Sequence, residues 1–346
     1  MRLLVAGAGA LGSWIGAELA ASGAETLWVA RGAQGAAIAE GGLRVEREGR
    51  PAFTVRPTIV SRVSEAADRG PFDLVLVTVK SYATAGLAEE LSRLGPLPCL
   101  LSLQNGLGNE AELAERLPDS RVCAGSVTAA CSLLAPGRVR AGAKGGLAYA
   151  GPDCGLDALA ARLEARGLPT RRYADAAAMK WSKLLLNMLG AASCAVLGWP
   201  PARVFENPAL FAVERAAWRE ALDVMEALGL PALGLPGYPV GLYAALARRL
   251  PEAWLFRLMA PRLARGRGER LPGPAADLAA GKPRTEIEWL NGAVARAGAS
   301  VARPVPVNTA LNRLVADLAI GRADRRAFAG RPEALLAYLS DAEIRT

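Results

Sequence analysis

The chain of 346 residues contains no histidine, and this absence excludes several kinds of chemistry at once. Without an imidazole it cannot use a Ser-His-Asp triad, a Cys-His protease pair, a histidine-ligated zinc ion or the His-acid proton relay of many hydroxy-acid dehydrogenases. Proton transfer must therefore use lysine, a carboxylate, tyrosine, cysteine or water. Lysine is itself scarce among the 41 basic residues, which are mostly arginines.

Cysteine is sparse and irregularly placed. The cysteines are odd in number, widely spaced and without a C-x-x-C pair: Cys99, Cys123, Cys131, Cys154 and Cys194. This pattern predicts neither a disulfide framework nor a metal knuckle, and it favours buried, reduced thiols. We expect no metal site.

Long apolar spans and basic stripes are also missing. The stretch from Leu3 to Ala24 is interrupted by Glu18 and a glycine turn, and Leu184 to Leu197 is too short to span a bilayer. We therefore expect Leu184 to Leu197 to form one core helix, and we expect no membrane association. No basic region precedes an apolar one, which predicts a cytoplasmic protein without a signal peptide. The net charge of +8 comes from scattered cations, so we expect no nucleic-acid partner; an anionic cofactor and a small acidic substrate suit this charge.

What is present begins with a G-x-G-x-x-G fingerprint at residues 7 to 12. Gly7 permits a tight turn, Gly9 lets backbone N–H groups approach a pyrophosphate, and Gly12 lets the next helix pack closely on the strand. We expect the whole turn to bind a dinucleotide phosphate at a helix N-terminus, through Gly7, Ala8, Gly9, Ala10, Leu11 and Gly12. The alternative is a plain turn in an Ala/Gly-rich chain.

The flanking pattern supports the dinucleotide interpretation. An apolar strand, Arg2 to Ala6, precedes the glycines, helical periodicity follows from Ala10 to Ala21, and a second strand runs from Glu25 to Ala30. An NAD site usually has an acid after this second strand, to bind the ribose 2′-OH. Here Arg31 stands in that place, which favours NADP; the alternative is a solvated loop arginine.

Two further strands end in candidate ligand-binding residues. The apolar run Phe72 to Val79 ends in Lys80, and Cys99 to Leu103 is followed by Gln104 and Asn105. Since the carboxyl ends of parallel strands line the ligand crevice, we expect Lys80 near phosphate or substrate and Asn105 near the nicotinamide or substrate. A solvated lysine and a simple Asn-Gly turn are the alternatives.

The length predicts two domains. Gly41 to Val60 is expected to form a hairpin insertion, the strands Val122 to Thr128, Arg138 to Ala141 and Gly146 to Ala150 are expected to continue the sheet, and long helical patterns follow Asp175. We therefore expect an α/β fold with an N-terminal NADP-binding Rossmann domain over residues 1–174 and an all-helical substrate and catalytic domain over residues 175–346.

The helical region carries its own candidates. Lys183 and Asn187 are four residues apart, so they share one helix face. We expect them to line a polar cleft, because burying a charged group and an amide without hydrogen-bond partners would cost free energy. Glu286 lies in the segment Arg284 to Gly292, which we expect to form an amphipathic helix. For an acid near a helix start, capping is the more common role.

Taken together, the motifs resemble the ketopantoate reductase family, within the 6-phosphogluconate-dehydrogenase-like group of two-domain enzymes. The resemblance covers nearly the whole chain through Gly7-x-Gly9-x-x-Gly12, Arg31, Val79 to Tyr82, Gln104 to Gly108, Trp181 to Lys183 with Asn187, Asp277-Leu278, Thr285 to Ile287 with Leu290 to Gly292, and Pro306 to Asn308. It implies an oxidoreductase that uses NADPH to reduce a 2-oxo acid to a 2-hydroxy acid, above all 2-dehydropantoate (ketopantoate) to pantoate in pantothenate biosynthesis.

The resemblance also implies residue roles. Lys183 would be the catalytic lysine, polarising the keto oxygen and supplying the proton as hydride arrives, with Glu286 and Asn105 completing the catalytic group. Asn187 and Glu286 would bind polar groups of the substrate, and Asn105 would also lie beside the nicotinamide.

The same resemblance places Arg31 and Lys80 on either side of the adenosine 2′-phosphate. It is incomplete at two substrate positions, where Gly273 replaces the family's serine and Ala191 replaces an asparagine. The substrate is therefore open, with another 2-oxo acid, an imine or a non-catalytic NADP sensor as alternatives. The role of residues 253–270 and a homodimer are open as well.

Overall fold

The computed structural model describes residues 1–267 and 269–344, which form two compact units. Unit 1 consists of residues 1–104, 108–180 and 235–238. Unit 2 consists of residues 105–107, 181–234 and the described residues from 239 onward.

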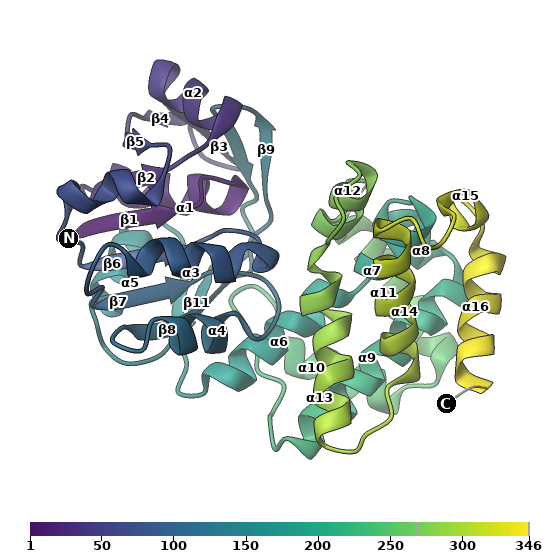
Figure 1. The fold of residues 1–346 in the computed structure, drawn as a ribbon. Helices are drawn as coiled ribbons and strands as arrows, with labels where there is room; N and C mark the ends of the chain where they lie inside the picture. The colour runs from purple at the N-terminus through teal and green to yellow at the C-terminus, as the bar shows by residue number, and fades with distance from the viewer. Residues whose placement is uncertain (268, 345–346) are drawn as a thin grey trace. The chain divides into compact units, whose positions relative to one another are not determined.

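Unit 1 is built on an eight-stranded sheet with the order β12-β11-β8-β7-β6-β1-β2-β5 (Figure 1). Its strands are β1 (Arg2–Ala6), β2 (Glu25–Val29), β5 (Thr58–Val60), β6 (Leu74–Val77), β7 (Cys99–Ser102), β8 (Arg121–Val127), β11 (Leu147–Ala150) and β12 (Thr170–Arg172). The strands from β5 to β8 in this order are parallel, whereas β11 is antiparallel to β8. The chain adds β2 and β5 on one side of β1 and then returns to β6 on the other, so the strand order reverses beside β1. Such a reversal is where dinucleotides bind in α/β sheets.

The central strands β1, β6 and β7 are mostly apolar and buried because helices cover both faces of the sheet. Leu3 and Val5 of β1 enter one core, and Leu4, the residue between them, enters the other. The first core includes side chains of α1 and α5, and the second includes side chains of α3 and α4. The helices of unit 1 are α1 (Ala10–Ala21), α2 (Gly32–Gly41), η1 (Val63–Arg69), η2 (Ser81–Ala83), α3 (Thr84–Ser92), α4 (Asn109–Arg116) and α5 (Leu156–Ala165). The expected Rossmann-type α/β arrangement is confirmed.

One strand prediction was wrong. Residues 138–141, expected in the main sheet, belong to a separate four-stranded sheet of order β4-β3-β10-β9, formed by β3 (Leu43–Arg47), β4 (Phe53–Val55), β9 (Cys131–Ala135) and β10 (Arg138–Ala141). In β10, Val139 is buried between the exposed Arg138 and Arg140, and both arginines form salt bridges with Glu46 of β3. Alternation of buried and exposed residues indicates a strand in a sheet with one solvent-exposed face. It does not indicate which strand lies next to it, because the partner strand can come from a distant part of the sequence.

Unit 2 is helical over its described residues, as expected. Its elements are the end of α6 (Ala176–Met188), then α7 (Ala191–Leu197), α8 (Pro201–Glu206), α9 (Pro208–Ala227), α10 (Val240–Arg249), α11 (Glu252–Arg267), α12 (Gly273–Ala279), η3 (Glu286–Trp289), α13 (Asn291–Ser300), α14 (Pro306–Ala319), α15 (Arg325–Phe328) and α16 (Pro332–Ile344). Within the part of the chain that the structure describes, no helix is both long enough and apolar enough to cross a membrane.

Two helix predictions need correction. Residues 184–197 do not form one helix, because Gly190 adopts a left-handed φ of 73° between α6 and α7. The buried carboxylate of Glu214 stabilises this break by accepting hydrogen bonds from the Gly190 N–H and the Ser193 hydroxyl. The segment 284–292 forms the 3₁₀ turn η3 and then begins α13, where a single amphipathic helix was expected.

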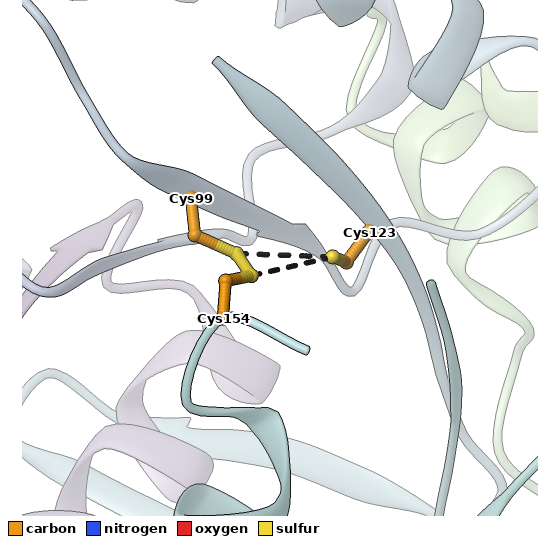
Figure 2. Close-up of side chains that lie close together, drawn as sticks. All are labelled: Cys99, Cys123 and Cys154. Atoms are coloured by element: carbon orange, nitrogen blue, oxygen red, sulfur yellow. Dashed lines mark hydrogen bonds between the residues drawn. A yellow bond between two sulfur atoms is a disulfide. The ribbon is translucent and has the colours of Figure 1, made fainter. Parts of the chain in front are cut away.

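The cysteines overturn a fourth expectation. Cys99 and Cys154, predicted to be reduced, are joined by a disulfide, and Cys123 lies beside both of them (Figure 2). The two cysteines are 55 residues apart in the sequence, and they come together only because β7, β8 and β11 are neighbours in the sheet. The spacing of the cysteines therefore could not predict this disulfide.

Candidate functional site

The glycine turn of unit 1 is determined by close packing between β1, α1 and the end of β6. Gly7 has a φ of 116°, and a Cβ at Gly12 would lie 2.0 Å from the Gly7 carbonyl oxygen and 2.4 Å from Thr78 Oγ1. The Thr78 hydroxyl donates a 2.6 Å hydrogen bond to that same carbonyl. Only glycine at position 12 allows α1 to begin this close to the strands.

The N-terminus of α1 suits an anion. Gly9 is its exposed N-cap, and a Cβ there would meet nothing within 4 Å. Over its described residues, α1 has neither a side-chain cap nor an acid in its first turn. The positive end of the helix and its first N–H groups are therefore not neutralised by a carboxylate of α1. Ala10 and Leu11 are half-exposed here, whereas the Ala8 side chain is buried and the Ala8 N–H bonds to Val29 O.

A pocket of about 510 Å³ opens beside Arg31, after β2. Its lining residues come from distant parts of unit 1: Arg31, Ser61, Arg62, Ser64, Glu90 and Arg93. The position after a strand identified Arg31, but no sequence signal identified the others, because the segment from Ser61 into η1 and the end of α3 reach the pocket only after folding. Lys80 is half-buried at the end of β6, where it is the N-cap of η2, and it is not among these lining residues.

Glu90 engages Arg31 directly. The Arg31 guanidinium donates to both carboxylate oxygens of Glu90 at 2.9 and 3.0 Å, and its Nε donates to the Ser61 carbonyl at 3.2 Å. The side chains of Arg31 and Glu90 are 62% and 37% exposed, so water screens the pair. The pocket keeps an excess of positive charge, because three arginines line it together with one acid.

In unit 2, Lys183 and Asn187 lie on one face of α6. Both are half-buried, whereas Leu184 to Leu186 between them are buried. The Asn187 amide donates a 2.8 Å hydrogen bond to Asn105 Oδ1. Thus the predicted residues Asn105 and Asn187, 82 positions apart, are in contact within unit 2.

The loop of residues 105–107 also lies against η3. Gly106 has a φ of 82°, and a Cβ there would lie 2.5 Å from Trp289 Cβ, while the Leu107 N–H donates to Trp289 O at 3.1 Å. Glu286, the first residue of η3, is only 4% exposed. The loop therefore links α6, which carries Lys183, to the segment that carries Glu286.

Lys180, three residues before Lys183, has a different environment. It is 5% exposed, and its ammonium donates to Gln104 O at 2.8 Å and pairs with Glu110 at 2.8 Å. These contacts neutralise its charge within unit 1 and give it a structural role.

The two positions that depart from the family pattern have no polar side chain. Gly273 is the exposed first residue of α12, and Ala191, at the start of α7, is buried. Neither can form a side-chain hydrogen bond with a substrate.

Comparisons with known proteins agree with this architecture. The family model described as Ketopantoate reductase PanE/ApbA matches residues 3–152, and the model Ketopantoate reductase PanE/ApbA C terminal matches residues 175–319. A 2-dehydropantoate 2-reductase of Halobacterium salinarum is 33% identical over 322 residues, which cover 91% of this chain and 98% of that protein.

Solved structures give the same result. The crystal structure of a PanE/ApbA family ketopantoate reductase from Ralstonia eutropha JMP134 matches with a TM-score of 0.76 and 31% identity, over 93% of this chain and 99% of that one. A D-mandelate dehydrogenase with NADH and anilino(oxo)acetate matches with a TM-score of 0.75 at 21% identity, over 93% and 99% of the two chains, which shows a shared fold alone. Both halves of the chain match the family models, and the full-length relatives are more than 30% identical, so the chain belongs to the ketopantoate reductase family of oxidoreductases.

Proposed function

We propose that the protein reduces a 2-oxo acid to a 2-hydroxy acid with NADPH, and that its substrate is 2-dehydropantoate. In this proposal residues 1–174 form the NADP-binding domain and residues 175–346 the catalytic domain. The observation that carries it is the arrangement in unit 2, where α6 with Lys183, the loop with Asn105 and the turn with Glu286 are held together by hydrogen bonds.

Lys183 is the proposed proton donor. Bound NADPH would supply a hydride to the carbonyl carbon. The Lys183 ammonium would donate a hydrogen bond to the keto oxygen, stabilise its growing negative charge and give it a proton, so that an alcohol forms. Because the chain contains no histidine, a lysine ammonium is a suitable cationic group to donate the proton in this step.

The neighbouring side chains would orient the substrate. The hydrogen bond between Asn187 and Asn105 restricts both amides, which reduces the entropy lost when they bind a substrate. Glu286 is buried at the start of η3 and would accept a hydrogen bond from a substrate hydroxyl.

The pocket beside Arg31 supports NADP over NAD. Its three arginines suit a 2′-phosphate, and the one acid there, Glu90, is engaged by Arg31. Lys80 would contact the same phosphate from the end of β6. The glycine turn and the N-terminus of α1 would hold the pyrophosphate through Gly7 to Gly12.

The substrate is the most open part of the proposal. Gly273 and Ala191 remove two polar contacts, and the fold also occurs in a D-mandelate dehydrogenase, so the fold does not select the substrate. Another 2-oxo acid or an imine is the alternative. The cytoplasmic location expected from the sequence stays a prediction, and a homodimer stays open.

The test is NADPH oxidation by the purified protein with 2-dehydropantoate and a panel of other 2-oxo acids. We expect Lys183→Ala and Lys183→Arg to lower kcat at least roughly a hundredfold while NADPH binding is retained, because arginine keeps the charge but is a poor proton donor. Lys144→Ala, at an exposed lysine of unit 1, is the control. Near-normal turnover by both Lys183 variants would refute its role, and NADPH binding without turnover on any substrate would favour a sensor.

A further inference from the structure

Three cysteines meet at one edge of the main sheet of unit 1 (Figure 2). Cys99 is the first residue of β7, Cys123 lies in the first half of β8, and Cys154 lies in the loop after β11. Since β11 runs antiparallel to β8, its carboxyl end lies at the amino ends of β7 and β8. The cluster is therefore at the opposite edge of the sheet from the glycine turn, and the proposed reductase mechanism does not use it.

The three sulfurs are in mutual contact. Cys99 and Cys154 form the disulfide, and Cys123 Sγ lies 3.7 Å from Cys99 Sγ and 3.6 Å from Cys154 Sγ. A reduced Cys154 would thus have two neighbouring sulfurs with which it could pair.

The cysteines differ in exposure. Cys99 and Cys123 are completely buried, whereas Cys154 is partly exposed. An external reagent can therefore reach Cys154 first, and the inner thiols react only through it.

The loop that carries Cys154 is shaped to lie against Cys123. Gly151 has a φ of 135°, and a Cβ there would lie 2.8 Å from Cys123 Sγ. The Cys123 thiol also contacts the Pro152 carbonyl, and Arg172 donates a 3.1 Å hydrogen bond to Gly151 O. A larger residue at position 151 would push the loop away from Cys123.

We propose that these cysteines form a redox site that reacts with low-molecular-weight disulfides, with Cys154 as the entry thiol, Cys99 as its main partner and Cys123 as its alternative partner. The Cys154 thiolate attacks the small disulfide, forms a mixed disulfide and releases one small thiolate. The Cys99 thiolate then attacks Cys154 Sγ, which forms the protein disulfide and releases the second small thiolate. Two protein thiols are oxidised, and the small disulfide is reduced to two thiols.

Cys123 permits a further exchange. Its thiolate can attack Cys154 Sγ, forming a Cys123–Cys154 bond and releasing Cys99 as a thiolate, with no net oxidation. Burial raises the pKa of the Cys123 thiol, an effect that Arg172 and Arg121 only partly oppose, so little of this thiol is in the reactive thiolate form and the exchange is slow. This agrees with the Cys99–Cys154 pairing in the structure.

A metal ion is the competing use of the same sulfurs. Three thiolates at this spacing suit a soft ion such as Zn²⁺ or Cu⁺. The disulfide uses two of the three ligands, and this favours redox chemistry.

The test uses the full chain, reduced, exposed to glutathione disulfide, alkylated and mapped by peptide mass spectrometry without reduction. We expect a Cys99–Cys154 bridge in the unaltered protein and a Cys123–Cys154 bridge in Cys99→Ser. The double variant Cys99→Ser, Cys123→Ser should retain glutathione on Cys154. Cys131→Ser, outside the cluster, should behave as the unaltered protein does.

NADPH binding and thermal unfolding of each variant show whether it is folded, and serine replaces cysteine with little change in volume. Bridges that involve Cys131 or Cys194, or inner thiols that are glutathionylated when Cys154 is serine, would overturn the proposal. Stoichiometric binding of Cd²⁺ by the reduced chain, with a thiolate-to-metal absorption band and no reaction with glutathione disulfide, would assign the cluster to metal binding.

Discussion

Replacing Arg31 with alanine should weaken NADPH binding while leaving NADH binding nearly unchanged. The Arg31 guanidinium lies in the pocket with Arg62 and Arg93 and is held by Glu90. The backbone of Arg31 is the N-cap of α2, but its side chain makes no capping hydrogen bond, so the substitution leaves the helix start intact. The change therefore removes a charge from the pocket without removing a structural contact of α2.

The size of the effect follows from two opposing contributions. A hydrogen bond to a charged group contributes about 1.5–3 kcal/mol. Binding a phosphate weakens the exposed Arg31–Glu90 pair, and such pairs contribute at most about 1 kcal/mol. The net loss in Arg31→Ala is then about 1–2 kcal/mol, which corresponds to roughly 5- to 30-fold weaker NADPH binding.

Glu90 gives the matching test with the opposite sign. At a separation of about 6 Å in water, one negative charge near another costs about 0.7 kcal/mol. Removing the charge in Glu90→Gln should therefore tighten NADPH binding about threefold, and it also frees Arg31 for the phosphate. NADH, which has no 2′-phosphate, should respond to neither substitution by more than about twofold.

The assay is titration of nicotinamide fluorescence with NADPH and with NADH, at two salt concentrations. Arg56→Ala, at an exposed arginine outside the pocket, is the control and should bind both cofactors normally. The preference for NADPH should fall as salt rises, because the contacts are exposed. An equal loss for both cofactors in Arg31→Ala, or no loss for NADPH, would refute the assignment of this pocket to the 2′-phosphate.

Three further substitutions test other parts of the structure. Gly12→Ala should weaken NADPH and NADH binding alike, by at least about tenfold in the same titration, because the new Cβ would lie 2.0 Å from the Gly7 carbonyl oxygen; an unchanged affinity would contradict the packing. Arg138 and Arg140 lower the pKa of Glu46 to about 2, so its contribution to stability is present above its ordinary value near 4.5 and is lost as the pH falls through about 2. The difference in Tm between the unaltered protein and Glu46→Gln should accordingly be largest above pH 4.5 and vanish near pH 2, and a constant difference would count against the ion pairs. Lys180→Met should cost about 2–3 kcal/mol in urea unfolding because it leaves Glu110 without its partner, whereas kcat/KM should change little; the reverse result would exchange the roles of the two α6 lysines.

The features that the sequence predicted correctly are governed by neighbours in the chain. A glycine at position 12 is required by the carbonyl of Gly7, only five residues away, so the fingerprint is readable as a local pattern. The apolar runs of β1 and β6 reveal that both of their faces are covered, because alternate side chains enter the two cores.

The features that it missed depend on contacts between distant segments. Glu90 forms a salt bridge with Arg31, 59 residues away in the sequence. The strand β10 pairs with β3, although its alternating pattern is compatible with any sheet that has one exposed face. The disulfide was missed for the same reason, since Cys99 and Cys154 are 55 residues apart. Spacing along the chain carries no information about such partners until the strand order is known.

The position of Lys183 can be argued from the helix itself. Lys180, Lys183 and Asn187 are at i, i+3 and i+7, so α6 presents all three on one face. Two of them bond to consecutive residues after β7: Lys180 to the Gln104 carbonyl and Asn187 to the Asn105 amide. Lys183 lies between these two anchors, one turn from each, and this helix face is therefore positioned by contacts that do not use its ammonium group. For the proposed proton donor, such anchoring fixes the direction in which the Lys183 side chain leaves the helix, and a defined direction is what a group that meets a reacting oxygen needs.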